Sequence, residues 1–238
     1  MIRLPRTLFL TGADRGLGLA LVEEFLRHGV HVFAGIHSSS AEIRGLTNVD
    51  YSLLTLIDLD VSVPDSIRAA VAAVDRHTDS LDVLVNSAGV HLEDKRVPLE
   101  ELDFDDGHLE RSMAVNAFGP LRVVQAFLPL LEEGTGRRIV NITSEAGSIG
   151  ACWRDREFAY SLSKCAANMA TRLLNNYLEP KGFDVLAIHP GWIRSEMGGP
   201  EADLSPAEAA TEVAGLILGP LPENGAIYID HRGNNLPW

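Results

Sequence analysis

Short apolar runs alternate with helical patterns from one end of the chain to the other. The runs are typical of buried strands and lie at Thr7–Thr11, Val30–Ile36, Leu53–Val61, Leu81–Asn86, Arg138–Thr143, Phe183–His189 and Ala226–Ile229. Apolar side chains spaced three or four residues apart predict helices at Leu17–His28, Asp65–Arg76, about Gly107–Glu132 and Phe158–Glu179. Such alternation implies right-handed crossovers and a parallel sheet with helices on both faces. The pattern predicts a doubly wound α/β fold with about seven strands, formed by residues 1–238 as a single domain.

Composition and charge limit the classes of partner. The chain has 33 acidic and 20 basic side chains, a formal net charge of −13, and 46% hydrophobic residues. This much apolar surface excludes a disordered protein, and the negative charge argues against nucleic acid and anionic lipid. No apolar run approaches the roughly 18 residues that cross a bilayer. We therefore expect a small-molecule substrate, no nucleic-acid partner and no membrane.

The cysteines and histidines indicate no metal site. Cys152 and Cys165 are too few for a disulfide framework or a four-ligand zinc site, which favours a reducing, cytoplasmic location. Histidines without metal-ligand spacing are expected at the surface or in ordinary packing; they are His28, His31, His77, His91 and His108.

A glycine-rich turn joins the first predicted strand to the first predicted helix. Its sequence is Thr11-Gly12-Ala13-Asp14-Arg15-Gly16-Leu17-Gly18. Glycines let the backbone turn tightly and approach a pyrophosphate, which the helix N-terminus attracts. Three glycines alone also fit an ordinary turn, but their place between strand and helix favours a dinucleotide site. The second strand ends without an acid, and Arg15 lies in the turn, so NADP(H) is favoured over NAD(H); a solvated loop arginine is the alternative.

A second group of residues points to proton transfer. Tyr160 and Lys164 are four residues apart on a predicted helix and share one face, so we expect the ammonium to lower the pKa of the phenol. This pair alone is a common coincidence. However, Ser144 directly follows a predicted strand, and Asn86-Ser87-Ala88-Gly89 ends the preceding one, both at the carboxyl edge of the sheet where ligands bind.

These motifs, in this order, resemble the classical short-chain dehydrogenases/reductases over nearly the whole chain, which implies an NAD(P)-binding Rossmann fold. The resemblance implies a catalytic tetrad of Asn116, Ser144, Tyr160 and Lys164. It also implies cofactor contacts at Gly12, Asp14, Arg15, Gly16, Leu17, Gly18, His37, Asp60, Val61, Asn86, Ser87, Ala88, Gly89, Tyr160, Lys164, Pro190, Gly191, Ile193 and Ser195.

Within this family, the stretch 189–200 and the ending Leu236-Pro237-Trp238 resemble the subgroup that contains sniffer and C-factor. That subgroup implies NADPH-dependent carbonyl reduction. Ser195 stands where the family usually has threonine, and His37 where many NADP-dependent relatives have arginine, which leaves NAD(H) possible. A substrate pocket with aromatic walls, suited to apolar or aromatic carbonyl compounds, is expected from Ser144, Cys152, Trp153, Tyr160 and Trp192.

The resemblance also implies a mechanism. Hydride passes to a carbonyl carbon while Tyr160 acts as general acid/base and Ser144 hydrogen-bonds the substrate oxygen. Lys164 binds the nicotinamide ribose, and Asn116 lies at a break in its helix. A low-turnover cofactor-binding signalling or sensor protein of the C-factor type is the alternative, and an inert structural subunit is a third. Family members commonly pair through the helices that hold Asn116 and Tyr160, so a homo-oligomer, dimer or tetramer, is expected.

Overall fold

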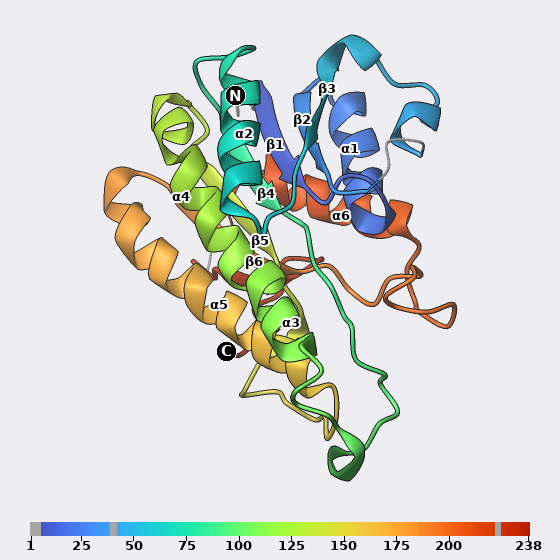
Figure 1. Ribbon diagram of the computed structural model, residues 1–238. Helices are drawn as coiled ribbons and strands as arrows, with labels where there is room; N and C mark the ends of the chain where they lie inside the picture. The colour runs from blue at the N-terminus through green and yellow to red at the C-terminus, as the bar shows by residue number, and fades with distance from the viewer. Residues whose placement is uncertain (1–5, 39–41, 222–224) are drawn as a thin grey trace.

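The computed structural model describes residues 6–38, 42–221 and 225–238. Within these ranges, seven strands form one sheet in the order β3-β2-β1-β4-β5-β6-β7, and every neighbouring pair is parallel (Figure 1). The strands are β1 (Thr7–Thr11), β2 (His31–Ile36), β3 (Leu54–Asp58), β4 (Val83–Asn86), β5 (Arg138–Ile142), β6 (Asp184–His189) and β7 (Tyr228–Asp230). The predicted doubly wound fold is confirmed.

Helices cover both faces of the sheet. They are α1 (Gly16–Arg27), α2 (Pro64–Asp75), α3 (His108–Asn116), α4 (Phe118–Glu133), α5 (Phe158–Leu178) and α6 (Pro206–Leu218). Figure 1 shows α1 and α6 on one side of the sheet and α2, α4 and α5 on the other. Short 3-10 helices lie at Ile43–Gly45, Tyr51–Leu53, Leu99–Glu101, Glu145–Gly147 and Glu179–Lys181.

The sheet separates two hydrophobic cores. Leu8 and Leu10 of β1 point into the core beneath α1 and α6, whereas Phe9 points into the core beneath α2 and α4. This alternation follows from the two-residue period of a strand. Because both faces are buried, the central strands are apolar throughout, which is why their runs are visible in the sequence.

Two elements differ from the sequence prediction. Helix α6 was not predicted, although Ser205 and Glu208 form a capping box at its start and Pro206 follows Ser205. Its apolar face consists largely of alanines, which give a weak hydrophobic pattern. The predicted helix at about 107–132 is two helices, α3 and α4, interrupted at Ala117. Asn116, the last residue of α3, lies at this break, as the family resemblance implies.

The stretch His108–Glu133 is long and apolar enough, by length and composition, to cross a membrane. It is the one such stretch in the part of the chain that the structure describes. Half of its most apolar window is buried inside the protein, where α4 contributes Val123 and Phe127 to the core. Core helices of soluble proteins are commonly as long and as apolar, so this stretch is weak evidence for a membrane span.

Asp82 joins the start of the sheet to the loop before β5. Its side chain, 5% exposed, accepts five hydrogen bonds of 2.7 to 3.3 Å, from the N–H groups of Arg6, Thr7, Thr135 and Gly136 and from the Thr135 hydroxyl. Burial would raise the pKa of Asp82, but these donors outweigh burial and lower the pKa below its usual value. The ionised carboxylate therefore stabilises the folded state.

We expect Asp82→Ala to lower the free energy of unfolding at pH 7 by about 2–4 kcal/mol, because buried N–H groups lose their acceptor. Since the pKa of Asp82 is lower in the folded state, its contribution is complete above the unfolded value of about 3.9 and is lost as pH falls below it. Urea unfolding of wild type and variant should therefore converge in acid. Asp79→Ala, at an exposed neighbouring residue, is the control. If Asp82→Ala lost the same free energy of unfolding at pH 7 and at pH 3, the stabilising role of the ionised Asp82 carboxylate would be contradicted.

Candidate active site

Two neighbouring strands lead to polar residues at one edge of the sheet. Asn86 is the last residue of β4, and its amide donates a hydrogen bond of 2.8 Å to the Asn141 side chain of β5. Ser144 lies two residues beyond β5, and its hydroxyl oxygen accepts the Ala146 N–H at 3.1 Å. Both Asn86 and Ser144 are buried. They lie at the carboxyl ends of adjacent strands, where ligands bind in open α/β sheets.

The first turn of α5 positions Tyr160. The loop after β4 caps this turn, because the Glu93 carboxylate accepts the N–H groups of Ala159 and Tyr160 at 3.1 and 2.7 Å. The buried ring of His91 stacks on the Tyr160 ring, with centroids 4.4 Å apart and planes inclined by 10°. His91, expected from the sequence to be an ordinary packing histidine, packs against a predicted catalytic side chain.

Lys164 lies one turn further along α5. Its buried ammonium donates to the Ile142 carbonyl at 3.2 Å and lies 5.8 Å from the centre of the Tyr160 ring. The 3-10 helix after Ser144 packs directly on this turn of α5. A Cβ at Gly147 would come within 2.5 Å of the Lys164 main chain, so glycine is required for this close approach.

Asn116 connects three segments of the site. Its side-chain oxygen accepts the Val90 N–H at 2.8 Å, and its amide donates to the Val90 carbonyl at 2.8 Å and to the Ser163 hydroxyl at 2.9 Å. The break between α3 and α4 therefore holds the loop after β4 against α5. Gly89 of this loop is bordered by Asn116 and Lys164, since a Cβ there would lie 3.4 Å from Asn116 Oδ1 and 3.7 Å from Lys164 Nζ.

The electrostatic environment of Tyr160 differs from the prediction. Burial raises the pKa of Tyr160 to about 12; a hydrogen bond with Ser144 and the charge of Arg154 oppose this shift, while Glu145 and Glu157 add to it. Burial also lowers the pKa of Lys164 to about 8, so its ammonium is a weaker source of positive charge than expected. The prediction of a lowered Tyr160 pKa is therefore wrong: burial is the largest effect and raises the pKa.

An ion-paired arginine lies beside Tyr160. The Arg154 guanidinium donates two hydrogen bonds of 2.6 Å to Glu145 and one of 2.8 Å to Glu157, and it covers the Trp153 ring at 4.6 Å. These acids are therefore neutralised locally, and Arg154 fixes the ends of the loop between Ser144 and Tyr160. In the described ranges, no group of three or more His, Cys, Asp or Glu side chains could hold a metal ion.

The glycine turn forms a cradle of main chain. Gly12 and Gly16 have φ of 69° and 55°, the left-handed region that favours glycine, and a Cβ at Gly18 would overlap the Gly12 carbonyl oxygen. A Cβ at Gly12 would in turn come within 2.7 Å of the Ala88 Cα. Thr11 joins these segments, because its hydroxyl oxygen accepts the N–H groups of Ser87 and Ala88, each at 3.0 Å.

The start of α1 fits a phosphate group. No side chain caps the helix, its first turn holds no acid, and Leu17 and Gly18 follow Gly16 directly. Unbonded N–H groups and the positive end of the helix dipole are therefore directed out of the cradle. The residues that are present fit the pyrophosphate of a dinucleotide.

Charged side chains lie beyond the cradle, towards the ends of β2 and β3. The Asp14 carboxylate accepts the Ser38 hydroxyl at 2.7 Å. His37 faces Asp60 at 3.4 Å, and Val61, which follows Asp60, is buried. Arg15, 64% exposed, forms an ion pair of 2.9 Å with the exposed Glu196.

The segment after β6 lies over the same edge. Gly191 has φ of 85°, and a Cβ there would come within 2.7 Å of Leu204. The Ser195 hydroxyl oxygen accepts the Gly198 N–H at 3.1 Å, and the Trp192 indole donates to the Gly198 carbonyl at 2.9 Å. Pro190 and Ile193 are buried. This segment is thus a folded loop whose conformation depends on its glycines.

A family model for short chain dehydrogenases matches residues 6–204. The chain belongs to the short-chain dehydrogenase family. Among its relatives, the C-signal protein of Myxococcus xanthus is 38% identical over 161 residues, which are 68% of this chain and 95% of that protein. The dehydrogenase is therefore an oxidoreductase, and the family inferred from its motifs is confirmed.

Two solved structures have closely similar folds. The carbonyl reductase Sniffer of D. melanogaster has a TM-score of 0.89 and 27% identity, covering 98% of this chain and 100% of that chain. An NADPH-bound carbonyl reductase from chicken fatty liver has a TM-score of 0.88 and 28% identity, covering 99% and 100%. The dehydrogenase thus resembles carbonyl reductases in fold.

The structure brings together residues that the sequence singled out separately. Asn116, Ser144, Tyr160 and Lys164 converge from α3, the end of β5 and α5. Cys152 and Trp153 are exposed on the loop after β5, and Trp192 is exposed on the loop after β6. Four residues that the sequence analysis did not list among the site residues bind the main chain of Tyr160 or act on its pKa; they are Glu93, Glu145, Arg154 and Glu157. Of these, Glu145 had a detectable signal, its position next to Ser144.

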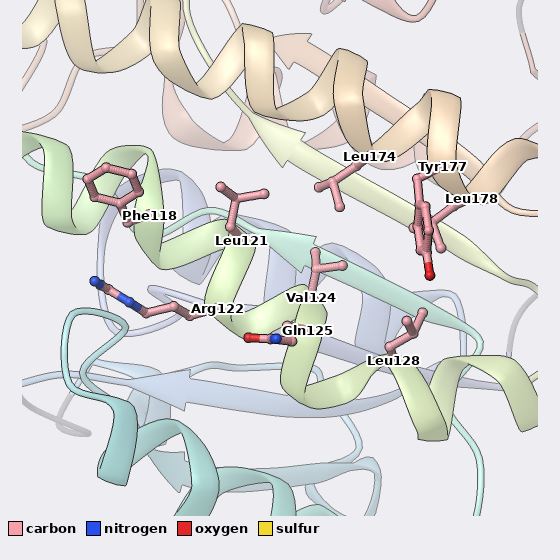
Figure 2. Close-up of a pocket in the computed structure, with 9 residues that line it drawn as sticks. All are labelled: Phe118, Leu121, Arg122, Val124, Gln125, Leu128, Leu174, Tyr177 and Leu178. Atoms are coloured by element: carbon pink, nitrogen blue, oxygen red, sulfur yellow. The ribbon is translucent and has the colours of Figure 1, made fainter.

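A hollow of about 520 Å³ lies away from the tetrad, between α4 and α5. Figure 2 shows Phe118, Leu121, Leu174 and Tyr177 around it, and none of the four tetrad residues lines it. The hollow is mostly apolar and opens on the outer face of these two helices. It therefore lies on the outer surface of the dehydrogenase, apart from the four predicted catalytic residues.

Proposed function

We propose that this dehydrogenase reduces the carbonyl group of an aldehyde or ketone with NADPH, and that Tyr160 is the proton donor. The observation that carries this proposal is the convergence of Ser144, Tyr160 and Lys164 beside a glycine cradle at one edge of the sheet. A protein that only bound a dinucleotide would need the cradle without the hydroxyl pair.

Tyr160 holds the proton and Ser144 polarises the substrate oxygen. With a pKa of about 12, the phenol is protonated at neutral pH, which is the form that donates. The Ser144 hydroxyl hydrogen-bonds the carbonyl oxygen most strongly when negative charge develops there. NADPH, when bound, supplies the hydride that adds to the carbonyl carbon.

The remaining residues hold this pair in place. His91 and Glu93 fix the ring and main chain of Tyr160, and Asn116 holds α5 against the loop after β4. Lys164 is placed to bind ribose hydroxyls, with its amine oriented by the Ile142 carbonyl. These contacts set the orientation on which proton transfer depends.

The substrate is an apolar or aromatic carbonyl compound. Ile149 and Trp153 are each 76% exposed on the loop after Ser144, and Trp192 and Met197 are exposed on the loop after β6. Exposed large apolar side chains on the two loops that follow β5 and β6 at the carboxyl edge of the sheet favour apolar ligands over sugars.

A second candidate function is that of a cofactor-binding signalling protein with little turnover. The similarity to the C-signal protein favours it. Such a protein would bind NADPH normally but would not depend on the Tyr160 hydroxyl.

Tyr160→Phe should lower carbonyl reduction by about 100- to 10,000-fold, because it removes the proton donor and keeps the ring. The measurement is NADPH consumption with aromatic aldehydes and diketones, together with the Kd for NADPH from its fluorescence, which should not change. Tyr177→Phe, an exposed tyrosine of the same helix, is the control. A variant that keeps roughly a tenth of the wild-type rate would exclude the role of Tyr160; wild type that binds NADPH and turns over none of these compounds would favour the signalling function.

Arg15 is proposed to bind the 2′-phosphate of NADP(H), since it is the cation within the cradle turn. Arg15→Gln should weaken NADPH binding by about tenfold or more, through loss of a charge-assisted hydrogen bond, and leave NADH binding almost unchanged. Fluorescence titration with both cofactors measures this, and Arg15→Lys should retain part of the preference. The choice of NADP(H) would be overturned if wild type bound NADH more tightly than NADPH, or if Arg15→Gln lowered the affinity for both cofactors equally.

We also propose that two copies pair through α4 and α5. Two exposed apolar side chains, Phe118 of α4 and Tyr177 of α5, line the hollow of Figure 2. Leu162, Met169 and Leu173 of α5 are also exposed, and their spacing of three to four residues or a multiple places them on one face with Tyr177. A patch of this kind is unusual on a monomer, and a two-fold contact would bury it from both copies at once.

Sedimentation measurements should find wild type as a dimer or tetramer and Leu173→Glu mainly as a monomer. A two-fold interface contains the same residue from both copies, so Leu173→Glu would bury two unpaired charges there. Leu99→Glu, at an exposed leucine of the short helix Leu99–Glu101, is the matched control and should assemble like wild type. Monomeric wild type at all concentrations, or the same effect from both substitutions, would contradict the pairing.

A further inference from the structure

Residues 228–238 hold the segment that carries Ser144. The Tyr228 hydroxyl, on a residue only 1% exposed, donates to the Ser144 carbonyl at 2.8 Å. Further along that segment, the buried Ser148 hydroxyl donates to the Pro237 carbonyl at 2.6 Å, and the Gly150 N–H donates to the Trp238 main-chain oxygen at 2.7 Å. The loop after Ser144 is thus bonded at three points to residues far away in the sequence.

The segment 234–238 is itself firmly placed. After β7 the chain reverses, and the Leu236 N–H donates to the Tyr228 carbonyl at 2.9 Å. The Trp238 ring packs against the Tyr228 ring, with centroids 5.0 Å apart, and the Arg172 guanidinium of α5 covers it at 4.8 Å. Trp238 therefore lies between β7 and α5, and its position is transmitted to the loop through Gly150.

Close approach makes this contact sensitive to small changes. A Cβ at Gly150 would lie 3.0 Å from the Trp238 main-chain oxygen and 3.2 Å from the Pro237 side chain. On its other side, the same loop segment rests against α5, where Gly147 meets the main chain of Lys164. Ser144 and its loop are therefore held between residues 237–238 and the helix that carries Tyr160.

We propose that Tyr228, Pro237 and Trp238 form a clamp that positions Ser144 and shapes the substrate wall formed by Ile149 and Trp153. The part of this proposal that concerns the substrate rests on the proposed carbonyl reduction. The clamp residues are positioning residues, because they act through Ser144 and the loop. In the part of the chain that the structure describes, the side-chain and ring contacts of Tyr228, Pro237 and Trp238 do not reach the glycine cradle. Cofactor binding should therefore be independent of the clamp.

Two variants test the clamp at its two ends. Trp238→Ala removes the ring between Tyr228 and Arg172, and Tyr228→Phe removes the bond to Ser144 while keeping the ring contact. Trp238→Phe keeps an aromatic ring and should restore most of what Trp238→Ala loses. Asn235→Ala, at an exposed side chain of the same segment, is the matched control.

We expect Trp238→Ala to raise the KM for a bulky aromatic ketone at least about fivefold more than the KM for a small aldehyde, with the Kd for NADPH unchanged. Tyr228→Phe should instead lower kcat for both substrates, because it frees Ser144. If the variants instead lose activity toward both substrates equally and in proportion to their loss of thermal stability, the contact is purely structural and the clamp is overturned. Failure of Trp238→Phe to restore KM would overturn it as well.

Hydrogen exchange of the peptide that contains Gly150 tests the clamp without turnover. Exchange should be faster in Trp238→Ala than in wild type, Trp238→Phe or Asn235→Ala, whereas unchanged exchange would overturn the proposal. If wild type reduces no carbonyl compound but Trp238→Ala speeds this exchange, carbonyl reduction fails and the clamp stands. If wild type is active and the exchange is unchanged, the clamp fails and carbonyl reduction stands.

Discussion

Main chain packed directly on main chain is the constraint on which the site depends. At Gly18 the first helix meets the turn at Gly12, and at Gly147 the segment after β5 meets α5 at Lys164. A side chain at either position would separate elements that must touch. The cradle and the hydroxyl pair therefore share one requirement, which is the absence of a Cβ at a few points where strand ends and helix starts converge. Such contacts leave little freedom to adjust, so the geometry of the site is set largely by the backbone.

The fold was predictable, and the four residues of the predicted tetrad could be singled out, because their signals are local. Buried parallel strands are apolar over their whole length, and Tyr160 and Lys164 share a helix face by spacing alone. Helix α6 was missed because alanines on its buried face give a weak pattern, although Ser205 and Glu208 mark its start. The parallel order of the strands then places Asn86 and Ser144 at one edge without further information.

The environment of Tyr160 was not predictable, because it depends on residues that meet only in three dimensions. Glu93 and His91 come from the loop after β4, and Arg154 is oriented by acids on both sides of it. Burial, which raises the pKa of Tyr160, is a property of the whole fold. The four-residue spacing between Tyr160 and Lys164 predicts that they are close but not that they are buried. The predicted sign of the Tyr160 pKa shift was therefore wrong, although Tyr160 and Lys164 lie close together as their spacing predicts.

The reversal of the chain after β7 has another consequence. Strand β7 is at one end of the sheet, and Asn235 forms an antiparallel bridge with Ile229 on the side of β7 away from β6. An uncovered strand edge offers free N–H and C=O groups to any other extended chain, which is a common route to aggregation. The short return of the chain occupies part of that edge. The segment that ends in Trp238 thus protects the sheet against uncontrolled strand addition, whichever substrate the site accepts.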